Sequence, residues 1–539
     1  MKQTKLYIAA VLLTLTVQSC EEFLDEPPAD LMSGSAFYQS TAQINQGIIG
    51  IYADLRYLSD YEYGMMSEMR SDNSWVNPTP NGQRDYSDIG SFRAGEELAT
   101  AESAWDTWYK VIYDANMAIK NINPSSDEEK QFLCEAKFLR GWAYFELSRL
   151  FGNIPVVLSP VSASEANATP QTDAKTVIET VVIPDLEAAL ELPERNAITD
   201  DMGTAVPEQG RADCVAAQAM LARVYMTLAG EPFGDTQAKT KAREYIDKVL
   251  EKKADYWAKT IDEWRKIWTP QTGKNQLPIF AIQYRTGGTG NPYIFNLVKQ
   301  LAPSYTDGVG VRLMQNDVYV DMALRYEFDK VYTSGGKDLR GEGWSVIDGY
   351  EAEGNTVAYP TQTSTLTLAD GTDVEVVSNA MYYKPLPSKP KMDYLGLTMS
   401  YSDLKDYNDW PVNFPVIRIE DIMLLKAELL AEEGNSEAMD IVNEIRERAG
   451  CDKIEATDKD EMTAAVRNER KIEFMGEGIR WFDQVRYGTW QEDTRALFAR
   501  HNNPEGTDVS NLRDGRHYYA IPINQMNITP GLYKQNDGY

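Results

Sequence analysis

The sequence predicts a mainly α-helical protein, in which tetratricopeptide-like helix pairs form a scaffold and a long loop-rich insertion carries short β-hairpins. Apolar residues recur at three- and four-residue steps from about residue 100 to 250, the period of amphipathic helices. Two further amphipathic helices joined by a three-residue turn are predicted between Ile419 and Gly450, close to a tetratricopeptide unit. Between about 255 and 415 the helical period fades, and Gly, Pro, Thr, Tyr and Asn dominate.

Residues 1–19 have the features of a signal peptide. Two lysines precede an apolar run from Leu6 to Val17, which is too short to cross a hydrocarbon core of about 30 Å. The end of this segment, Val17 to Cys20, resembles a bacterial lipobox, which predicts that Cys20 becomes the acylated first residue of the mature chain. Several acyl chains would anchor the protein to a membrane. Ordinary secretion with Cys20 as an incidental thiol is the alternative.

The strongest predicted helix runs from Glu135 to Phe151. It is apolar around most of its circumference, which is typical of a helix packed between other helices. Gly152 and Pro155 then provide a C-terminal cap and a helix breaker. Helices of similar length are predicted for residues 177–192 and 212–228.

The segment 255–415 is predicted to be an insertion with turns and short strands. Residues 363–377 alternate in polarity around Asp370-Gly371, which predicts a β-hairpin. Long loops inside a folded chain are usually functional, so we expect the ligand-binding face here. The expected division is an N-terminal helical part at 20–254, the insertion at 255–415, and a C-terminal helical part at 416–539 that closes the scaffold.

Composition argues against several functions. The 539 residues carry a formal net charge of −29, and we find no basic patch, so nucleic-acid binding is not predicted. The two histidines, His501 and His517, cannot supply a His-rich zinc site. The sequence has no His-Glu-x-x-His, Gly-x-Ser-x-Gly or P-loop motif. We therefore predict no metal, no cofactor and no catalytic residue.

Charged residues alternate in sign near the C-terminus, from Arg467 to Arg486. Glu473 and Glu477 could be the paired carboxylates of a glycosidase. Arg–carboxylate pairs that lock helix ends together are the interpretation that we favour, because carboxylates beside arginines stay ionised and do not suit a general acid.

Six blocks in order along the mature chain resemble the SusD/RagB family, the surface glycan-binding lipoproteins of Bacteroidetes. The most specific are in the C-terminal part. The blocks are residues 20–27, 108–116, 135–155, 210–225, 469–488 and 521–539, the fifth containing Glu469-Arg470-Lys471-Ile472-Glu473-Phe474 and Gly478-Ile479-Arg480-Trp481-Phe482-Asp483.

The resemblance implies a helical, non-enzymatic lipoprotein on the extracellular side of the outer membrane. Members of this family cover a SusC-like TonB-dependent transporter, capture an oligosaccharide and deliver it for import. Glu21-Glu22 after Cys20 resembles the acidic export signal of such surface lipoproteins. A surface glycoside hydrolase and a structural lid with little ligand affinity of its own are the alternatives.

A sugar site needs exposed aromatic rings for stacking and polar side chains for hydrogen bonds. The first candidate is the N-terminal loop, whose equivalent contributes to the glycan site in the family; an ordinary solvated loop with one packed Trp is the alternative. Its residues are Asp72, Asn73, Trp75, Asn77 and Arg84. The second candidate lies in the insertion and comprises Tyr284, Asn291, Tyr293, Tyr305, Arg312 and Trp344.

Overall fold

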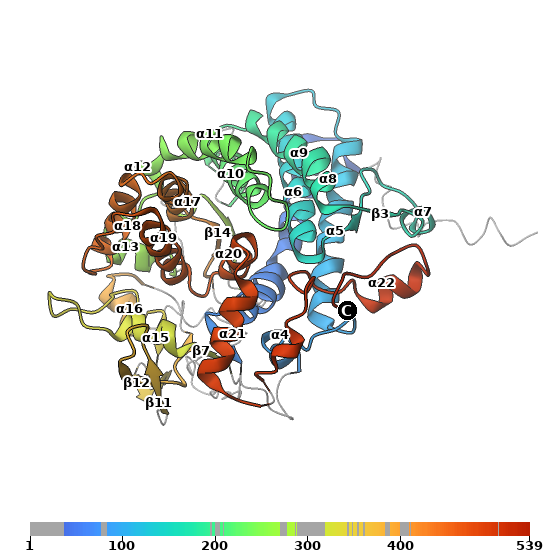
Figure 1. Cartoon of the computed structure of the whole chain (residues 1–539). Helices are drawn as coiled ribbons and strands as arrows, with labels where there is room; N and C mark the ends of the chain where they lie inside the picture. Colours follow the sequence, from blue (N-terminus) through green and yellow to red (C-terminus); the bar gives the residue numbers. More distant parts are fainter. Residues whose placement is uncertain are drawn as a thin grey trace, which may run out of the picture.

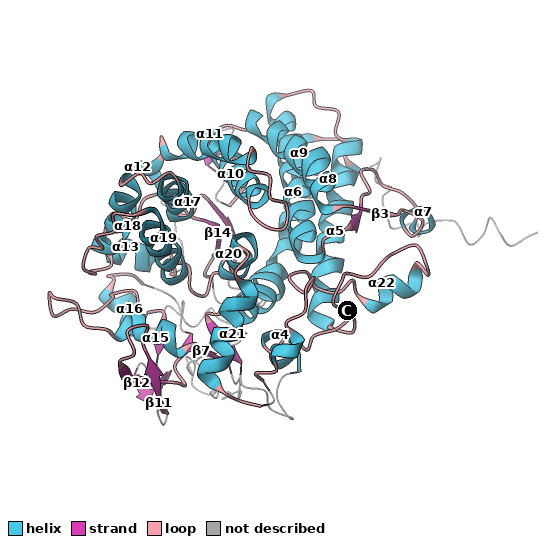
Figure 2. Ribbon diagram, viewed as in Figure 1, coloured by secondary structure: helices cyan, strands magenta, loops and turns pink. Residues whose placement is uncertain are grey.

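The structure is a computed structural model of the whole chain. It describes residues 37–539 apart from the following breaks: 77–83, 195–196, 200–204, 208–209, 270–276, 286, 288–317, 342–343, 348, 353–354, 359–361, 383–388, 399–408, 410 and 505. Helices dominate, and the strands occur as short antiparallel pairs (Figure 2), which confirms the predicted fold class.

An N-terminal group of helices forms one flank of the molecule (Figure 1). The helix α6 packs between α5, α3 and α9, as its nearly continuous apolar surface predicts. Its first turn is capped by the Ser126 side chain, and its end is set by Gly152, at φ 70°. The main elements are α3 (Thr41–Asp54), η2 (Ser59–Ser67), α4 (Arg84–Gly90), α5 (Ala99–Asn121), α6 (Asp127–Phe151), α8 (Ala174–Val177), η4 (Ile178–Val182) and α9 (Ile183–Ala188).

The helical array continues around the molecule through α10, α11 and α17 (Figure 1). The predicted pair between residues 419 and 450 is confirmed as α17 and α18, which pack against each other and against α19. The elements of this part are α10 (Cys214–Ala229), α11 (Ala238–Leu250), α12 (Lys253–Tyr256), α13 (Ile261–Lys266), α17 (Ile419–Glu432), α18 (Glu437–Arg448), α19 (Lys459–Glu473), α20 (Arg480–Tyr487), α21 (Trp490–His501) and α22 (Ile523–Ile528).

The region between α13 and α17 carries most of the strands. The predicted hairpin is confirmed: residues Thr363–Thr367 (β11) pair with Asp373–Val377 (β12), and Leu366 and Val376 are buried beside Met322. The other elements are β6 (Phe280–Ile282), β7 (Val318–Val320), α15 (Met322–Asp329), β8 (Val346–Ile347), β9 (Gly349–Ala352), β10 (Asn355–Ala358), β13 (Met381–Tyr382), α16 (Lys389–Tyr394) and β14 (Phe414–Ile417). The division of the chain at residues 254 and 415 stays a prediction.

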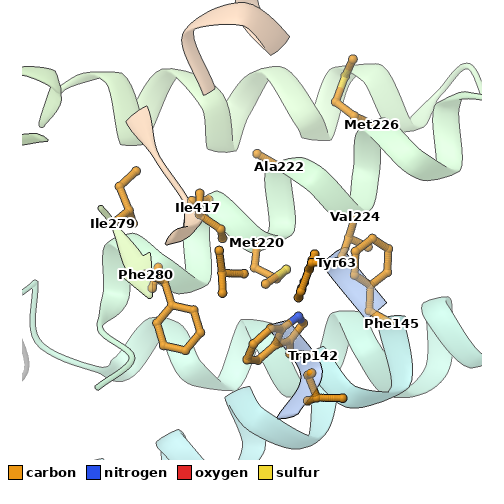
Figure 3. Packing of buried hydrophobic residues seen from close by; sticks show 14 of the residues in the cluster. Tyr63, Trp142, Phe145, Met220, Ala222, Val224, Met226, Ile279, Phe280 and Ile417 are labelled. Atoms are coloured by element: carbon orange, nitrogen blue, oxygen red, sulfur yellow. The ribbon is translucent and has the colours of Figure 1, made fainter. Parts of the chain in front are cut away.

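One large apolar core joins the two helical groups. Figure 3 shows its centre, where side chains of α6, α10 and the β6–β14 pair meet. Phe280 of β6 packs edge-on against Trp142, with ring centroids 5.3 Å apart and an interplanar angle of 85°. This contact ties β6, near the start of the insertion, to the central helix α6.

Strand β1 (Ser74–Val76) attaches the N-terminal segment to the insertion. It pairs antiparallel with β7, so that Trp75 lies opposite Tyr319. None of the described helices is long and apolar enough to cross a membrane.

Candidate functional site

The candidate site is built on α13, whose start is fixed by a capping box. The Thr260 side chain accepts a hydrogen bond from the Glu263 N–H, and the Glu263 side chain accepts one from the Thr260 N–H. Trp264 points inward, is fully buried, and donates its Nε1–H to Glu473 Oε1 at 3.0 Å. This inward anchor places the next residue, Arg265, at the edge of the insertion.

Arg265 is the centre of the site. Its Nη1 donates to Asp262 Oδ1 at 3.0 Å and to the Tyr394 hydroxyl at 3.3 Å, and its Nη2 donates to the Leu339 carbonyl at 3.0 Å. The guanidinium carbon lies 4.4 Å from the ring centroid of Trp344 and 5.6 Å from that of Tyr394. A cation held against two rings in this way fixes the orientation of both.

A tight turn places Trp344 over Arg265. The Gly341 carbonyl accepts hydrogen bonds from the N–H groups of Trp344, at 2.9 Å, and Ser345, at 2.8 Å. Gly341 is needed there, because a Cβ atom would lie 2.8 Å from Phe328 Cβ. Tyr394 comes from the end of α16, whose Met392 is buried, and its own side chain is 63% exposed.

Together Trp344 and Tyr394 form an aromatic platform. The ring centroids lie 6.2 Å apart, and the planes meet at 57°. Trp344 is partly buried, whereas Tyr394 presents most of its surface to solvent. Exposed aromatic faces offer stacking surfaces for the C–H faces of a sugar, and the Tyr394 hydroxyl and Asp262 carboxylate offer polar contacts at the edge.

A buried ionic cluster holds the platform to the frame. Arg340, fully buried, follows Leu339 directly and contacts Asp338, Glu469 and Glu473, with its Nη1 2.7 Å from each glutamate. Glu473 on α19 also accepts hydrogen bonds from Arg418 and Arg448. Because buried charge pairs keep fixed geometry, this cluster sets the position of the turn that carries Trp344.

The same contacts bear on whether the C-terminal carboxylates Glu473 and Glu477 could be a catalytic pair. Glu473 and Glu477 are 0% and 2% exposed, and Arg418 binds both. Neither carboxylate has the exposed surface that contact with a glycosidic bond requires. This geometry supports the structural interpretation of these residues.

The N-terminal loop lies differently from what the sequence indicated. Asp72, Asn73 and Trp75 are 5%, 0% and 7% exposed, so the expectation of a solvent-exposed binding loop is wrong for these three. Asp72 binds Arg480 and Lys471, both at 2.7 Å. Trp75 stacks on His501, with centroids 4.3 Å apart and planes within 2° of parallel. The Asp72 carboxylate and the Trp75 ring, which were expected to contact a sugar, are therefore bound by other side chains of the protein.

The structure describes only some of the other residues that were predicted for this loop. Asn73 donates its Nδ2–H to Glu68 Oε1 at 2.9 Å, another internal contact. Asn77 lies outside the described residues. Arg84 is the first residue of α4, and its side chain is not among those described.

The insertion brings one predicted residue to the platform. Trp344 is part of it, whereas Tyr284 is partly buried elsewhere and donates its hydroxyl hydrogen to the Arg56 carbonyl. The other four predictions, Asn291, Tyr293, Tyr305 and Arg312, lie outside the described residues.

Sequence reasoning missed Arg265 and Tyr394. Arg265 lies on a helix of only six residues, in which both Trp264 and Arg265 are buried, so helical periodicity did not single it out. Tyr394 had a weak signal, since it follows a Pro-rich stretch and precedes Leu395-Gly396 in a segment without helical period. Among the described residues, no group of three or more His, Cys, Asp or Glu side chains could hold a metal ion.

Comparison with known proteins agrees with the fold. The SusD family model matches residues 212–539, and a model described as starch-binding associating with outer membrane matches residues 22–226. A SusD-like protein of Formosa agariphila is 24% identical over 586 residues, covering 99% of both chains.

Solved structures show the same architecture. A SusD homolog from Bacteroides thetaiotaomicron has a TM-score of 0.74 at 20% identity, covering 93% of this chain and 98% of its own. A laminarin binding SusD-like protein has a TM-score of 0.64 at 20% identity, covering 92% and 99%. The SusD family model thus matches more than half of the chain. The chain belongs to the SusD family.

Proposed function

We propose that the protein binds a glycan at the aromatic platform of Trp344 and Tyr394, without catalysis. The observation that carries the proposal is the platform itself: an exposed tyrosine and a partly exposed tryptophan fixed by a buried arginine. Rigid aromatic anchors of this kind dominate binding energy, because little conformational entropy is lost on contact. Similar proteins described as laminarin binding and as surface glycan-binding support this function.

The platform can be tested by truncating its rings. Tyr394→Ala and Trp344→Ala should each weaken glycan affinity by about tenfold or more, which corresponds to at least about 1.4 kcal/mol. A glycan array with the soluble form lacking Cys20 would identify the ligand, and calorimetry would measure the variants. Tyr113→Ala is the matched control, since Tyr113 is 51% exposed on α5. Unchanged affinity in both platform variants would remove the platform from the binding site.

We further propose that the protein is a lipoprotein, anchored through Cys20 on the outside of the outer membrane, and that it delivers oligosaccharide to a SusC-like TonB-dependent transporter. The lipobox-like sequence and the family model associated with the outer membrane support this. Cys20→Ala should move the protein from the membrane fraction to the soluble fraction and abolish labelling by a fatty-acid analogue.

Two outcomes would favour the other candidate functions. Release of reducing sugar by the purified protein, lost in Glu473→Gln, would indicate a glycoside hydrolase. Copurification with a β-barrel, combined with no binding on the glycan array, would indicate a lid that has little ligand affinity of its own.

A further inference from the structure

Two glutamates meet in the core where the N-terminal helices contact the C-terminal segment. Glu62 lies in η2 and Glu146 on α6; both are 0% exposed, and both carboxyl groups contact the one guanidinium group of Arg149. We propose that this pair holds a single shared proton at neutral pH, and that losing it at higher pH loosens the contact between the two parts of the frame. This pH-sensitive device is independent of glycan binding.

Glu146 is the better stabilised of the two as a carboxylate. It accepts hydrogen bonds from Arg149 Nε, from Trp142 Nε1 at 2.7 Å and from the Tyr63 hydroxyl at 3.1 Å. Figure 3 shows Tyr63 close to Trp142, and both side chains donate to the same oxygen of Glu146. One charged and two neutral donors satisfy an ionised carboxylate in a dry environment.

Glu62 receives much weaker support for a negative charge. The neutral Trp108 indole donates Nε1–H to Glu62 Oε2 at 2.6 Å, and Arg149 Nη2 reaches Glu62 Oε1 only at 3.3 Å. Arg149 is thus shared by two carboxyl groups, with its shorter contact to Glu146. Among the residues that the structure describes, a second full negative charge here would have no cation of its own, so the proton belongs on Glu62.

The other charges nearby are already paired. Tyr63 and Arg149 border a small cavity that is also lined by Arg223, Arg470, Arg486, Asp421 and Asp483. Arg223 lies 2.7 Å from Asp421, Arg470 pairs with Asp421 and Asp483, and Arg486 pairs with Asp483 and Glu428. These arginines are therefore committed to carboxylates other than Glu62.

The expected protonation agrees with the electrostatics of the site. Burial, and then the negative charge of Glu146, raise the pKa of Glu62 well above its usual value. Burial also opposes the ionisation of Glu146, but the charge of Arg149 and the hydrogen bonds outweigh it and lower that pKa. Two interacting carboxyl groups of this kind titrate as a pair in separated steps.

Ionisation of Glu62 would affect contacts between the N-terminal helices and the region of α20. The Arg149 guanidinium stacks on the ring of Phe482 in α20, 3.4 Å from the centroid, and Tyr63 lies against Gly478 in the turn before α20. An ionised Glu62 would draw Arg149 toward itself or admit water. Either response would disturb the contact of Arg149 with Phe482.

The sign of the effect follows from linkage. Folding raises the pKa of Glu62, so the protonated side chain stabilises the folded state. This contribution is complete below the pKa that Glu62 has in the unfolded chain, about 4.3, and it is lost as the pH rises through the higher pKa of the folded protein. Glu62→Gln mimics the protonated form, so it should remove this loss.

The test compares melting temperatures of the full mature protein and E62Q from mildly acidic pH to just below the range in which cysteine and tyrosine titrate. We expect the melting temperature of the wild type to fall relative to that of E62Q as pH rises. The control is E135Q: Glu135 is also 0% exposed, but Arg211 binds it with two hydrogen bonds, from Nε at 2.8 Å and from Nη2 at 3.0 Å. This variant should melt lower at every pH, with the wild-type pH dependence.

Infrared spectroscopy measures the proton directly. At neutral pH the wild type should show the carbonyl band of a buried protonated carboxyl group, and E62Q should lack it. Parallel melting curves, or a wild-type spectrum without that band, would overturn the proposal. If E62Q does not fold, the wild-type spectrum alone tests the proposal: the band should be present at neutral pH and disappear at higher pH.

Discussion

The ion pair between Arg480 and Asp72 is the contact whose removal tests the structural role of the C-terminal motif. Arg480 Nε donates to Asp72 Oδ1 at 2.7 Å and Nη2 to Oδ2 at 3.2 Å, and both side chains are less than 10% exposed. Arg480 also contacts Asp493, at 3.2 Å. The pair thus joins the N-terminal segment to α20 and α21.

The expected cost of Arg480→Ala follows from what the change leaves behind. Breaking a buried ion pair by removing one partner costs about 3–5 kcal/mol, because the other charge stays buried. Here Asp72 keeps Lys471 at 2.7 Å, so we expect the lower end, about 3 kcal/mol. Burial opposes ionisation of Asp72, but Arg480 and then Lys471 outweigh it and hold its pKa well below the usual range.

The assay is denaturant unfolding of the wild type, Arg480→Ala, Asp72→Ala and the double variant, which together form a double-mutant cycle. Lys130→Ala is the control, since Lys130 pairs with Asp127 at 2.8 Å on the surface, where an ion pair contributes little, and this variant should unfold close to the wild type. The stability that Asp72 contributes is present above the usual aspartate pKa and is lost as pH falls. Arg480→Ala should therefore also show a weaker loss in acid.

One result would refute this reasoning. If Arg480→Ala unfolds within about 1 kcal/mol of the wild type yet loses glycan affinity, the pair serves ligand binding, as the sequence first indicated for Asp72.

Two further predictions concern backbone strain and acid stability. Gly478→Ala should destabilise the protein by more than about 2 kcal/mol in denaturant unfolding, because φ is 68° there and a Cβ atom would lie 2.4 Å from the Tyr63 carbonyl oxygen. Gly531→Ala is the control: φ is 77° but no atom lies near the added Cβ, so this variant measures the backbone strain alone. Burial, and then the charge of Arg70, lower the pKa of His517 to about 4, so its contribution is present above about pH 6.5 and lost as pH falls through about 4. His517→Phe should weaken the decline of melting temperature over that interval, and an unchanged decline would contradict this.

The site was only partly predictable, as two tryptophans show. Trp75 and Trp344 both lie in polar segments without helical period, and the sequence favoured both as sugar contacts. Trp75 is buried because a strand far along the chain pairs with its own and His501 covers its ring. Trp344 stays partly exposed, with Arg265 behind it. Local sequence does not record these distant partners.

The helical frame, the insertion hairpin and the structural character of the C-terminal motif could all be predicted from the sequence. Periodic apolar residues and turn signals act over a few residues, so they can be recognised without tertiary contacts. Which aromatic rings are exposed, and which carboxyl groups share an arginine, could be learned only from the folded arrangement. Both depend on contacts between residues such as Arg265 and Tyr394, or Glu62 and Arg149, that meet only after the chain has folded.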